Sequence, residues 1–333
     1  MRDGSQFRRW ILCGAILLFG SEPIRAQGMN VVNGSLPNMG SMALPGGSFA
    51  GVGGSKVQTA DPELNIRDSL MGWIDAAAPR SVMGLRFEST WNNVQPMRAE
   101  YYHPKGGPGG TVGFPLPETR VSYQELTTFT EYRIVPWLSV FLEAPYRWIA
   151  PEINENRAGT GDMRYGMKIV TWSDQNAIAT ILLRVYQPSA SNAILGTSHW
   201  SIEPGLLAAY RFNDNLLIEG ELRYWIPING SDFAGDILRY GIGLSWGKRK
   251  TGMWYAPVLE GIGWTVFSGK TMVATSPDLF TIQDIAGQTT VNAYLGVRWG
   301  YGANLDFYAG YGRAFSGNYW QRDLFRFEIR YVY

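Results

Sequence analysis

Cysteine, histidine and an excess of charge of either sign are nearly absent from this sequence. Its 333 residues include 1 cysteine and 2 histidines, and 29 basic residues stand against 28 acidic ones. The single cysteine, Cys13, excludes an internal disulfide framework. The isolated His103 and His199 make no convincing metal site. The balance of charge gives no electrostatic case for nucleic acid as a partner.

Complete nucleotide-binding motifs are also missing. The tripeptide Gly269-Lys270-Thr271 has the end of a phosphate-binding loop, but the first glycine of that motif would stand where the chain has Trp264. The glycine-rich segment 51–56 lacks the Gly-Lys step. Neither segment has the context of a strand leading into a helix, so we expect no bound nucleotide and no other cofactor.

Long hydrophobic runs are absent apart from a short one near the N-terminus. Three arginines precede the apolar segment 10–19, and Ala26 is a small residue at a suitable cleavage position. These features are typical of a secretory signal peptide. The run is too short to cross a bilayer as a helix. We therefore predict that residues 1–26 are a signal peptide that is removed on export.

The last strand-sized segment of the chain, 324–333, alternates between apolar and polar residues. Successive side chains of a strand point to opposite faces, so one face carries only apolar and aromatic residues and the other carries three charges. The chain also stops on an aromatic residue. This ending resembles the C-terminal signature of bacterial outer-membrane β-barrels. The predicted signal for the barrel-assembly machinery consists of Phe325, Phe327, Ile329, Tyr331 and Tyr333.

The same alternation recurs along most of the chain after residue 80. It is clear in the segments 138–148, 163–171, 200–212, 216–226, 238–246 and 291–299. The segment 120–134 changes phase near residues 123–126, which predicts a bulge. The segment 253–266 has no clear parity, so its faces are not assigned. Several tryptophans fall near strand ends, as in the aromatic belts of membrane barrels: Trp91, Trp148, Trp172, Trp200, Trp246 and Trp299.

Short and long connections alternate between these segments. Turns at about 135–136, 173–176, 213–215, 247–252 and 300–303 alternate with longer stretches at about 92–118, 149–160, 188–198, 227–235, 267–287 and 315–322. Outer-membrane barrels are built in this way, with the turns on the periplasmic side. We predict an all-β fold over residues 80–333. It is a transmembrane, antiparallel, up-and-down β-barrel of about twelve strands with short periplasmic turns and longer extracellular loops.

Two further segments precede the barrel. Residues 27–60 are rich in Gly, Ser, Asn and Pro, which predicts a flexible periplasmic lead. In 61–79, Asp61-Pro62 has the form of a helix start and a loose apolar face follows. This segment is either a short helix or an ordered loop, and either could plug the mouth of the barrel.

If the apolar faces meet lipid, the polar faces line the lumen. The predicted lumen-lining residues are Arg86, Glu88, Glu143, Arg147, Asp162, Arg164, Lys168, Arg184, Glu203, Arg211, Glu219, Glu221, Arg223, Arg239, Arg298, Arg326, Glu328 and Arg330. A strongly selective pore would carry one sign of charge in excess along its lining. Here the two signs interleave, so we expect cross-strand ion pairs to fill much of the lumen.

Several short motifs carry a family resemblance. They are the sequences at 141–147 (FLEAPYR), 159–162 (GTGD), 196–205 (GTSHWSIEPG), 257–264 (PVLEGIGW) and 310–313 (GYGR). In this order they resemble outer-membrane β-barrel proteins grouped as transporters, similar to the "meta-pathway of phenol degradation" family. The resemblance covers most of residues 80–333. It implies an outer-membrane barrel and a link with small hydrophobic or aromatic compounds, and it brings no catalytic residues.

The sequence thus favours a non-enzymatic outer-membrane channel for passive passage of small solutes, with membrane lipid, the barrel-assembly machinery and a small solute as partners. One alternative is a lipid hydrolase, because His199 and Ser201 resemble the His-x-Ser element of outer-membrane phospholipase A. That family continues with Asn-Gly, whereas this chain continues with Ile202-Glu203, and the predicted faces point both residues inward. A structural barrel with a closed lumen is the other alternative.

Overall fold

The computed structural model describes residues 66, 68–93, 120–230, 233–276, 279–316 and 320–333. The predicted signal peptide, the predicted lead, most of 61–67 and His103 lie outside these ranges. The strands are β1 (Val82–Asn93), β2 (Val121–Val135), β3 (Leu138–Pro151), β4 (Arg157–Thr160), β5 (Met163–Ser173), β6 (Ala177–Gln187), β7 (Trp200–Arg211), β8 (Leu216–Ile228), β9 (Ile237–Trp246), β10 (Met253–Val266), β11 (Lys270–Ser276), β12 (Leu279–Asp284), β13 (Thr289–Tyr301), β14 (Leu305–Ala314) and β15 (Asp323–Val332). Among the described residues, no helix is both long and apolar enough to cross a membrane.

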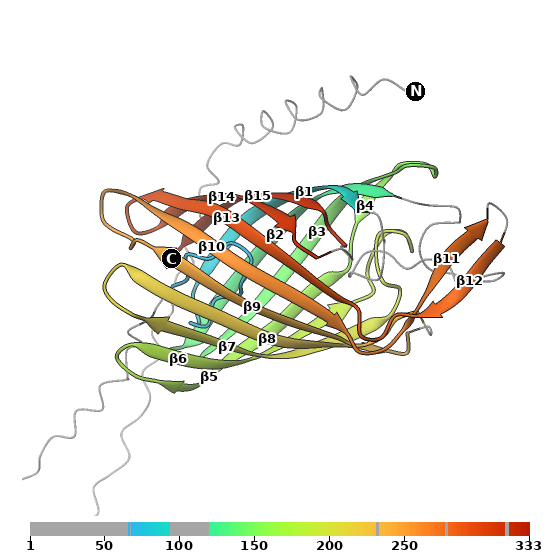
Figure 1. Ribbon diagram of the computed structural model, residues 1–333. Coiled ribbons are helices and arrows are strands. Elements are labelled where there is room, and N and C mark those ends of the chain that lie inside the picture. Colours follow the sequence, from blue (N-terminus) through green and yellow to red (C-terminus); the bar gives the residue numbers. More distant parts are fainter. Residues whose placement is uncertain (1–65, 67, 94–119, 231–232, 277–278, 317–319) are drawn as a thin grey trace, which may run out of the picture. The chain divides into compact units, whose positions relative to one another are not determined.

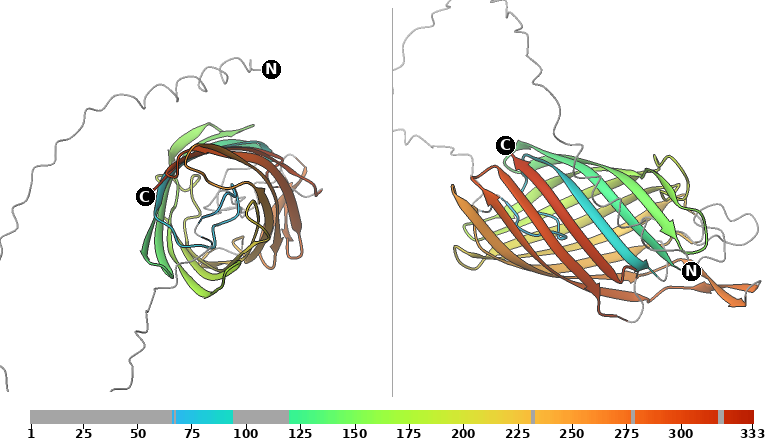
Figure 2. Two further views of the ribbon diagram at one scale, coloured as in Figure 1. Left: turned by 90° about the vertical axis from the view of Figure 1, so that its left-hand side faces the viewer. Right: turned by 90° about the horizontal axis from the view of Figure 1, so that it is seen from above.

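Twelve of these strands form a closed antiparallel barrel (Figures 1 and 2). Each pairs with the next barrel strand along the chain, and the barrel closes where β1 pairs with β15, from Val82 opposite Val332 to Trp91 opposite Asp323. The short β4 adds to β3 beyond the end of β5, and β11 pairs with β12 in a separate hairpin that projects past the barrel. The predicted twelve-strand antiparallel barrel is confirmed.

The connections differ in length at the two ends of the barrel. One end, which we call the turn end, carries the short turns 136–137, 174–176, 212–215, 247–252 and 302–304. The other, the loop end, carries the longer loops, which include 152–162, 188–199, 267–288 and 315–322. Both the start of β1 and the end of β15 lie at the turn end (Figure 1). The alternation of short and long connections is therefore as predicted.

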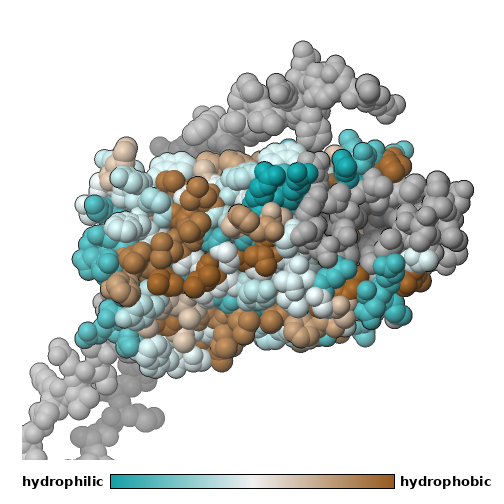
Figure 3. Space-filling model, viewed as in Figure 1, coloured by the Kyte–Doolittle hydropathy of each residue, from teal (hydrophilic) through white to brown (hydrophobic). Residues whose placement is uncertain are grey.

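The outer wall of the barrel is apolar because of the strand periodicity. In β3 every second side chain is exposed, and these include Val140, Leu142 and Trp148, while the charged side chains between them are buried. Hydrophobic residues cover much of the wall visible in Figure 3. Exposed tryptophans lie at both ends of the strands, Trp148 and Trp200 at the loop end and Trp172 and Trp246 at the turn end. The wall thus has the arrangement of a lipid-facing surface with aromatic belts.

Two strands differ from expectation. β2 keeps one phase from Val121 to Glu131, so the bulge predicted near residues 123–126 is wrong, and its pairing with β3 shifts register only between Arg133 and Val135. The irregularity lies on β1, where Thr90 and Asn93 pair with Tyr123 and Val121. β10 has clear faces, because residues 254, 256, 258, 260 and 262 are all buried inside the barrel. Both strands carry apolar side chains on the inward face, so their two faces look alike in the sequence.

These inward apolar residues pack against chain that lies inside the barrel. Residues 68–80, which we call the plug, form an irregular segment with bends and no helical turn. The plug lies inside the barrel (Figure 2). Its start is at the turn end, where Asp68 contacts Arg249 of the turn 247–252, and Trp73 stacks on Tyr294 in the middle of β13. The plug then returns to the turn end, where β1 begins. Of the two forms considered for 61–79, the described part takes the irregular one.

The interior core is therefore built between plug and wall. Met71, Trp73 and Ile74 form one buried cluster with the wall residues Val258, Ile262, Tyr294, Tyr308 and Leu324. The Trp73 ring stacks on Tyr294 with 4.3 Å between ring centroids. A second cluster joins Ala77 and Ala78 to side chains of β3, β6, β7 and β8. Because burying apolar surface contributes about 25 cal/mol per Å², these contacts favour the docked plug.

Candidate functional site: the plugged lumen

Side chains of the wall hydrogen-bond the carbonyl groups of the plug. Ser69 accepts from Arg330 at 2.6 Å, Leu70 and Met71 accept from Arg298 at 3.0 and 2.8 Å, Gly72 accepts from Arg326, and Trp73 accepts from Arg239 at 2.7 Å. Closer to the point where the plug returns, the Thr180 hydroxyl donates to the carbonyl of Ala77 at 2.6 Å. Five consecutive carbonyl groups are thus satisfied by four arginines of three different strands, β9, β13 and β15.

The amide groups at the tip of the plug converge on one carboxylate. Glu260, on β10, accepts from the N–H groups of Gly72 at 2.8 Å, Trp73 at 2.9 Å and Ile74 at 2.8 Å. Glu221, on β8, accepts from the next amide, that of Asp75, at 3.2 Å. Hydrogen bonds to a charged acceptor are stronger than neutral ones. Glu260 is therefore the main anchor of the plug tip.

These contacts explain the interleaved charges of the lumen. An irregular segment cannot satisfy its peptide groups internally, and each buried peptide group left without a partner costs free energy. Arginines supply donors for its carbonyl groups and glutamates supply acceptors for its amides. A wall that holds such a segment needs both signs of charge side by side.

Two aspartates of the plug sit among arginines. Asp68 contacts Arg80 at 3.2 Å, Arg249 at 2.6 Å and Arg330 at 3.2 Å. Burial opposes ionisation of Asp68, but these arginines outweigh it and hold the pKa of the carboxyl well below its ordinary value. Asp75, near the tip, contacts Arg184 and Arg223, which in the same way lower its pKa well below the ordinary value against the effect of burial.

The sign of these shifts sets an expected pH dependence. A carboxyl group whose pKa is lower in the docked plug stabilises docking fully above its ordinary value of 3.8, and this contribution is lost as the pH falls through the docked value. We expect the difference in closed fraction between the unaltered protein and the Asp68→Asn, Asp75→Asn double variant to stay constant from about pH 7 to about pH 5 in planar-bilayer recordings. A difference that disappears by pH 5 would show that Asp68 and Asp75 do not hold the plug.

Ion pairs within the wall fill the space that the plug leaves. Arg147 contacts Glu125 at 2.5 Å, and Arg164 contacts Glu125 at 3.1 Å and Glu143 at 3.3 Å. Lys168 pairs with Glu131 at 2.9 Å. The expected cross-strand ion pairs are thus present along the lumen.

The predicted lumen-lining residues lie on inward positions of the strands, apart from Asp162, which lies in the connection between β4 and β5. Fifteen of them are buried, and Arg86, Arg211 and Arg239 are half-buried. The sequence did not predict seven further charged residues that take part in these contacts, two of the plug and five of the barrel: Asp68, Asp75, Glu125, Glu131, Arg249, Glu260 and Asp306. Glu260 was missed because apolar and polar residues do not alternate in the sequence of β10. Asp68 and Asp75 belong to a segment without any period, so no sequence pattern marks them.

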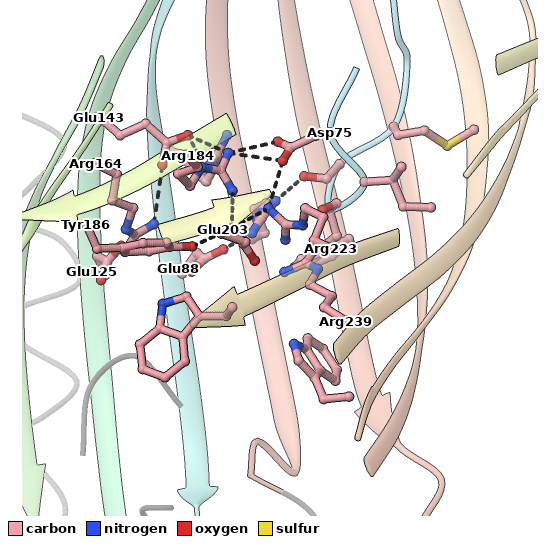
Figure 4. Close-up of a pocket in the computed structure, with 18 of the residues that line it drawn as sticks. Asp75, Glu88, Glu125, Glu143, Arg164, Arg184, Tyr186, Glu203, Arg223 and Arg239 are labelled. Carbon is pink, nitrogen blue, oxygen red and sulfur yellow. Dashed lines mark hydrogen bonds and ion pairs between the residues drawn. The ribbon is translucent and has the colours of Figure 1, made fainter. Parts of the chain in front are cut away.

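A cavity of about 130 Å³ remains between the plug tip and the loop end. Its floor includes residues 71–75 of the plug and the arginines around Asp75 (Figure 4). Toward the loop end it is lined by the aromatic residues Tyr186, Trp225, Trp264 and Trp320. The cavity therefore joins a charged floor to an aromatic upper wall, and we call it the vestibule.

Loops fold inward beside the vestibule. Arg147 donates to the carbonyl of Leu195, and Asp162 accepts from the amide of Thr197 at 2.7 Å, so both hold the loop between β6 and β7. From the loop before β15, the amide of Gln321 donates to the Tyr123 hydroxyl at 2.6 Å. Polar residues that were expected to line an open pore thus also anchor the loops at its mouth.

His199 and Ser201, the pair that resembles the His-x-Ser element of the phospholipase, lie inside the barrel. His199 is 7% exposed and Ser201 is fully buried, at the loop end of β7. The His199 ring lies 5.8 Å from that of Trp225, between centroids. Neither side chain is on the outer wall of the barrel.

Comparisons with solved structures identify the fold. The chain is similar to the COG4313 outer membrane channel from Pseudomonas putida F1, with a TM-score of 0.51 and 13% identity over 80% of this chain and 99% of that one. The KdgM porin gives a TM-score of 0.44 at 10% identity over 76% of this chain and 99% of that one. LpxR from Salmonella typhimurium gives a TM-score of 0.42 at 10% identity over 75% of this chain and 100% of that one.

No family model and no curated protein matches the chain. The resemblance to the meta-pathway of phenol degradation family therefore stays a prediction. At 13% identity the similarity to the first of these structures shows the fold and no more. The fold is that of an outer-membrane β-barrel.

Proposed function

We propose that the protein is an outer-membrane channel for small solutes that its own plug closes. The observation that carries this proposal is how residues 68–80 are held. They form no strand pairing with the barrel, and their backbone contacts with it run through wall side chains such as Glu260 and Arg298. Water can replace such contacts without breaking any strand pairing of the barrel. Release of the plug therefore leaves the ring of strands intact and opens a pore through it.

The rest of the proposal follows from this architecture. The apolar wall between two aromatic belts fits the outer membrane as location and its lipid as surrounding, with export by the N-terminal signal and assembly through the aromatic C-terminal strand. The aromatic lining of the vestibule fits small hydrophobic or aromatic solutes and membership of the resembled transporter family. Buried, inward-facing positions for His199 and Ser201 leave the hydrolase alternative without support.

Single-channel recording in planar bilayers tests the proposal. We compare refolded protein of residues 27–333 with a variant that begins at residue 80, after checking by heat-modifiable migration that both are folded. The full chain is expected to be mostly closed, and the truncated barrel is expected to show discrete conducting steps. Folded truncated barrel without steps would contradict the channel and would favour a structural barrel.

A further inference from the structure

The plug carries a carboxylate into a site made for one. The Asp75 side chain lies between Arg184 of β6 and Arg223 of β8 (Figure 4). Arg184 donates to the two carboxylate oxygens at 3.3 and 3.0 Å, and Arg223 donates to one of them at 2.8 Å. Two guanidinium groups that converge on one carboxylate are a common way for proteins to bind organic acids.

The wall carboxylates near these arginines are less well placed. Glu203 lies 3.4 Å from both guanidinium groups, Glu143 lies 3.8 Å from Arg184, and Glu221 lies 3.5 Å from Arg223. The Nε atoms of Arg184 and Arg223 are buried and make no hydrogen bond, and Glu221, at 3.5 Å, is in ion-pair contact with the Nε atom of Arg223. Asp75 therefore provides the best contacts of both arginines, and its departure leaves a carboxylate site with unused donors.

The vestibule keeps a small excess of positive charge without the plug. Among the described residues that line it, seven are arginines and six are carboxylates, and the plug contributes Arg80 and Asp75 to these two sets. With the plug withdrawn, six arginines would face five carboxylates. Arg184 and Arg223 would then have lost the acceptor with their shortest contacts, so an anion is attracted to the level that Asp75 occupies in the closed lumen.

An apolar chamber adjoins this anion site. The rings of Tyr186 and Trp225 are in edge-to-face contact, with 6.3 Å between their centroids. The ring centroids of Trp264 and Trp320 are 5.8 Å apart, and the guanidinium carbon of Arg239 lies 5.4 Å from the centroid of the Trp264 ring. The vestibule of about 130 Å³ is close in size to a cavity of about 150 Å³ that holds benzene. The vestibule beside the docked plug is therefore large enough for one flat ring, and the anionic end of that molecule would take the place of Asp75.

We propose that Arg184 and Arg223, with the aromatic chamber, form a binding site for a small aromatic carboxylate, whose anion half Asp75 occupies while the plug is docked. The proposal rests on the proposed channel function in that the acid is a solute of the channel. Because acid and Asp75 compete for the same arginines, binding of the acid favours the released plug. The channel then opens in response to its own solute.

Benzoate is a suitable probe, with benzamide as its uncharged counterpart and acetate as the anion without a ring. Binding is measured by titration calorimetry on folded residues 27–333 in detergent. The substitution Asp75→Asn removes the competitor, so we expect benzoate to bind at least roughly tenfold more tightly than to the unaltered protein. Benzamide and acetate are expected to gain much less. Adding Arg184→Gln or Arg223→Gln to Asp75→Asn is expected to abolish the gain.

Asp68→Asn is the matched control. Asp68 is the other aspartate of the plug that pairs with arginines, but its partners are Arg80, Arg249 and Arg330 and not Arg184 or Arg223. If Asp68→Asn increases benzoate affinity as much as Asp75→Asn does, the gain comes from a looser plug and the proposed site is wrong. Equal gains for benzamide, or no gain for benzoate, would also overturn it. Asp75→Ala serves if the Asn variant does not fold.

Binding and conduction are measured separately, so the two proposals can fail separately. Benzoate binding to a truncated barrel that does not conduct would leave the site in place and reject the channel. Conduction by the truncated barrel without any effect of Asp75→Asn on benzoate binding would keep the channel and reject the site.

Discussion

The substitution Glu260→Gln is expected to raise the open probability of the channel on the order of 100-fold. Glu260 accepts three amide groups at the plug tip, at 2.8, 2.9 and 2.8 Å. Glutamine has one acceptor oxygen where glutamate has two, and it turns a donor group toward an amide that the second oxygen accepts. Hydrogen bonds to a charged group contribute about 1.5–3 kcal/mol each, so losing the charge and one acceptor oxygen costs the docked plug about 3 kcal/mol. That free energy corresponds to about 100-fold in the docking equilibrium.

The measurement is the fraction of time that single channels spend open in planar bilayers. Thr180→Val is the control of similar shape, because it removes one neutral hydrogen bond to the carbonyl of Ala77 and leaves the anchor at the tip intact. We expect it to raise the open probability only about fivefold, for a loss of about 1 kcal/mol. If Glu260→Gln changes the open probability no more than Thr180→Val does, the glutamate is not the anchor of the plug.

The substitution Arg298→Met is expected to lower the free energy of unfolding by about 3 kcal/mol. Arg298 is fully buried, and it donates to the plug carbonyls of Leu70 and Met71, to Asp306 at 2.7 Å and to Glu328 at 2.8 Å. Methionine fills similar volume without any donor. The loss stays at the lower end of that for broken buried ion pairs, because Arg330 still contacts Asp306 and Arg86 still contacts Glu328.

Heat-modifiable migration at increasing urea or temperature measures this loss. The exposed pair of Lys248 with Asp214 provides the control, because Lys248→Met breaks a contact in water and is expected to change stability by less than about 1 kcal/mol. Arg298→Met in the barrel that begins at residue 80 separates the two roles of the arginine. A loss of equal size with and without the plug would mean that the plug carbonyls contribute nothing to it.

The strands could be predicted because membrane barrels place a local constraint on every residue. In lipid each strand must pair its backbone on both sides and turn apolar side chains outward, so the sequence alternates with a period of two. β3, β7, β8 and β15 follow this rule closely, and their bounds agree with the predicted segments within a few residues. The lengths of turns and loops then give strand number and direction without any knowledge of distant contacts.

The sequence could assign residues to the inward face of a strand only where that face carries polar or charged side chains. Along β10, residues 254, 256, 258 and 262 are apolar and inward because the plug packs on them. A strand that is apolar on both faces has no visible period, so Glu260 could not be assigned to the lumen. The same cause produced the wrong bulge on β2, where Tyr123 and Phe129 are buried inward positions.

What the sequence alone determined is therefore the barrel: its class, its strand number, its ends and its lipid-facing side. What only the tertiary structure decided is what fills it. The plug has no period, and its partners lie far along the chain, as Gly72 and Glu260 do at 188 residues apart. Such contacts exist only in the closed barrel, because closure brings residues of β6, β8, β10, β13 and β15 to one small volume. The site of the proposed solute, between Arg184, Arg223 and Asp75, exists only there.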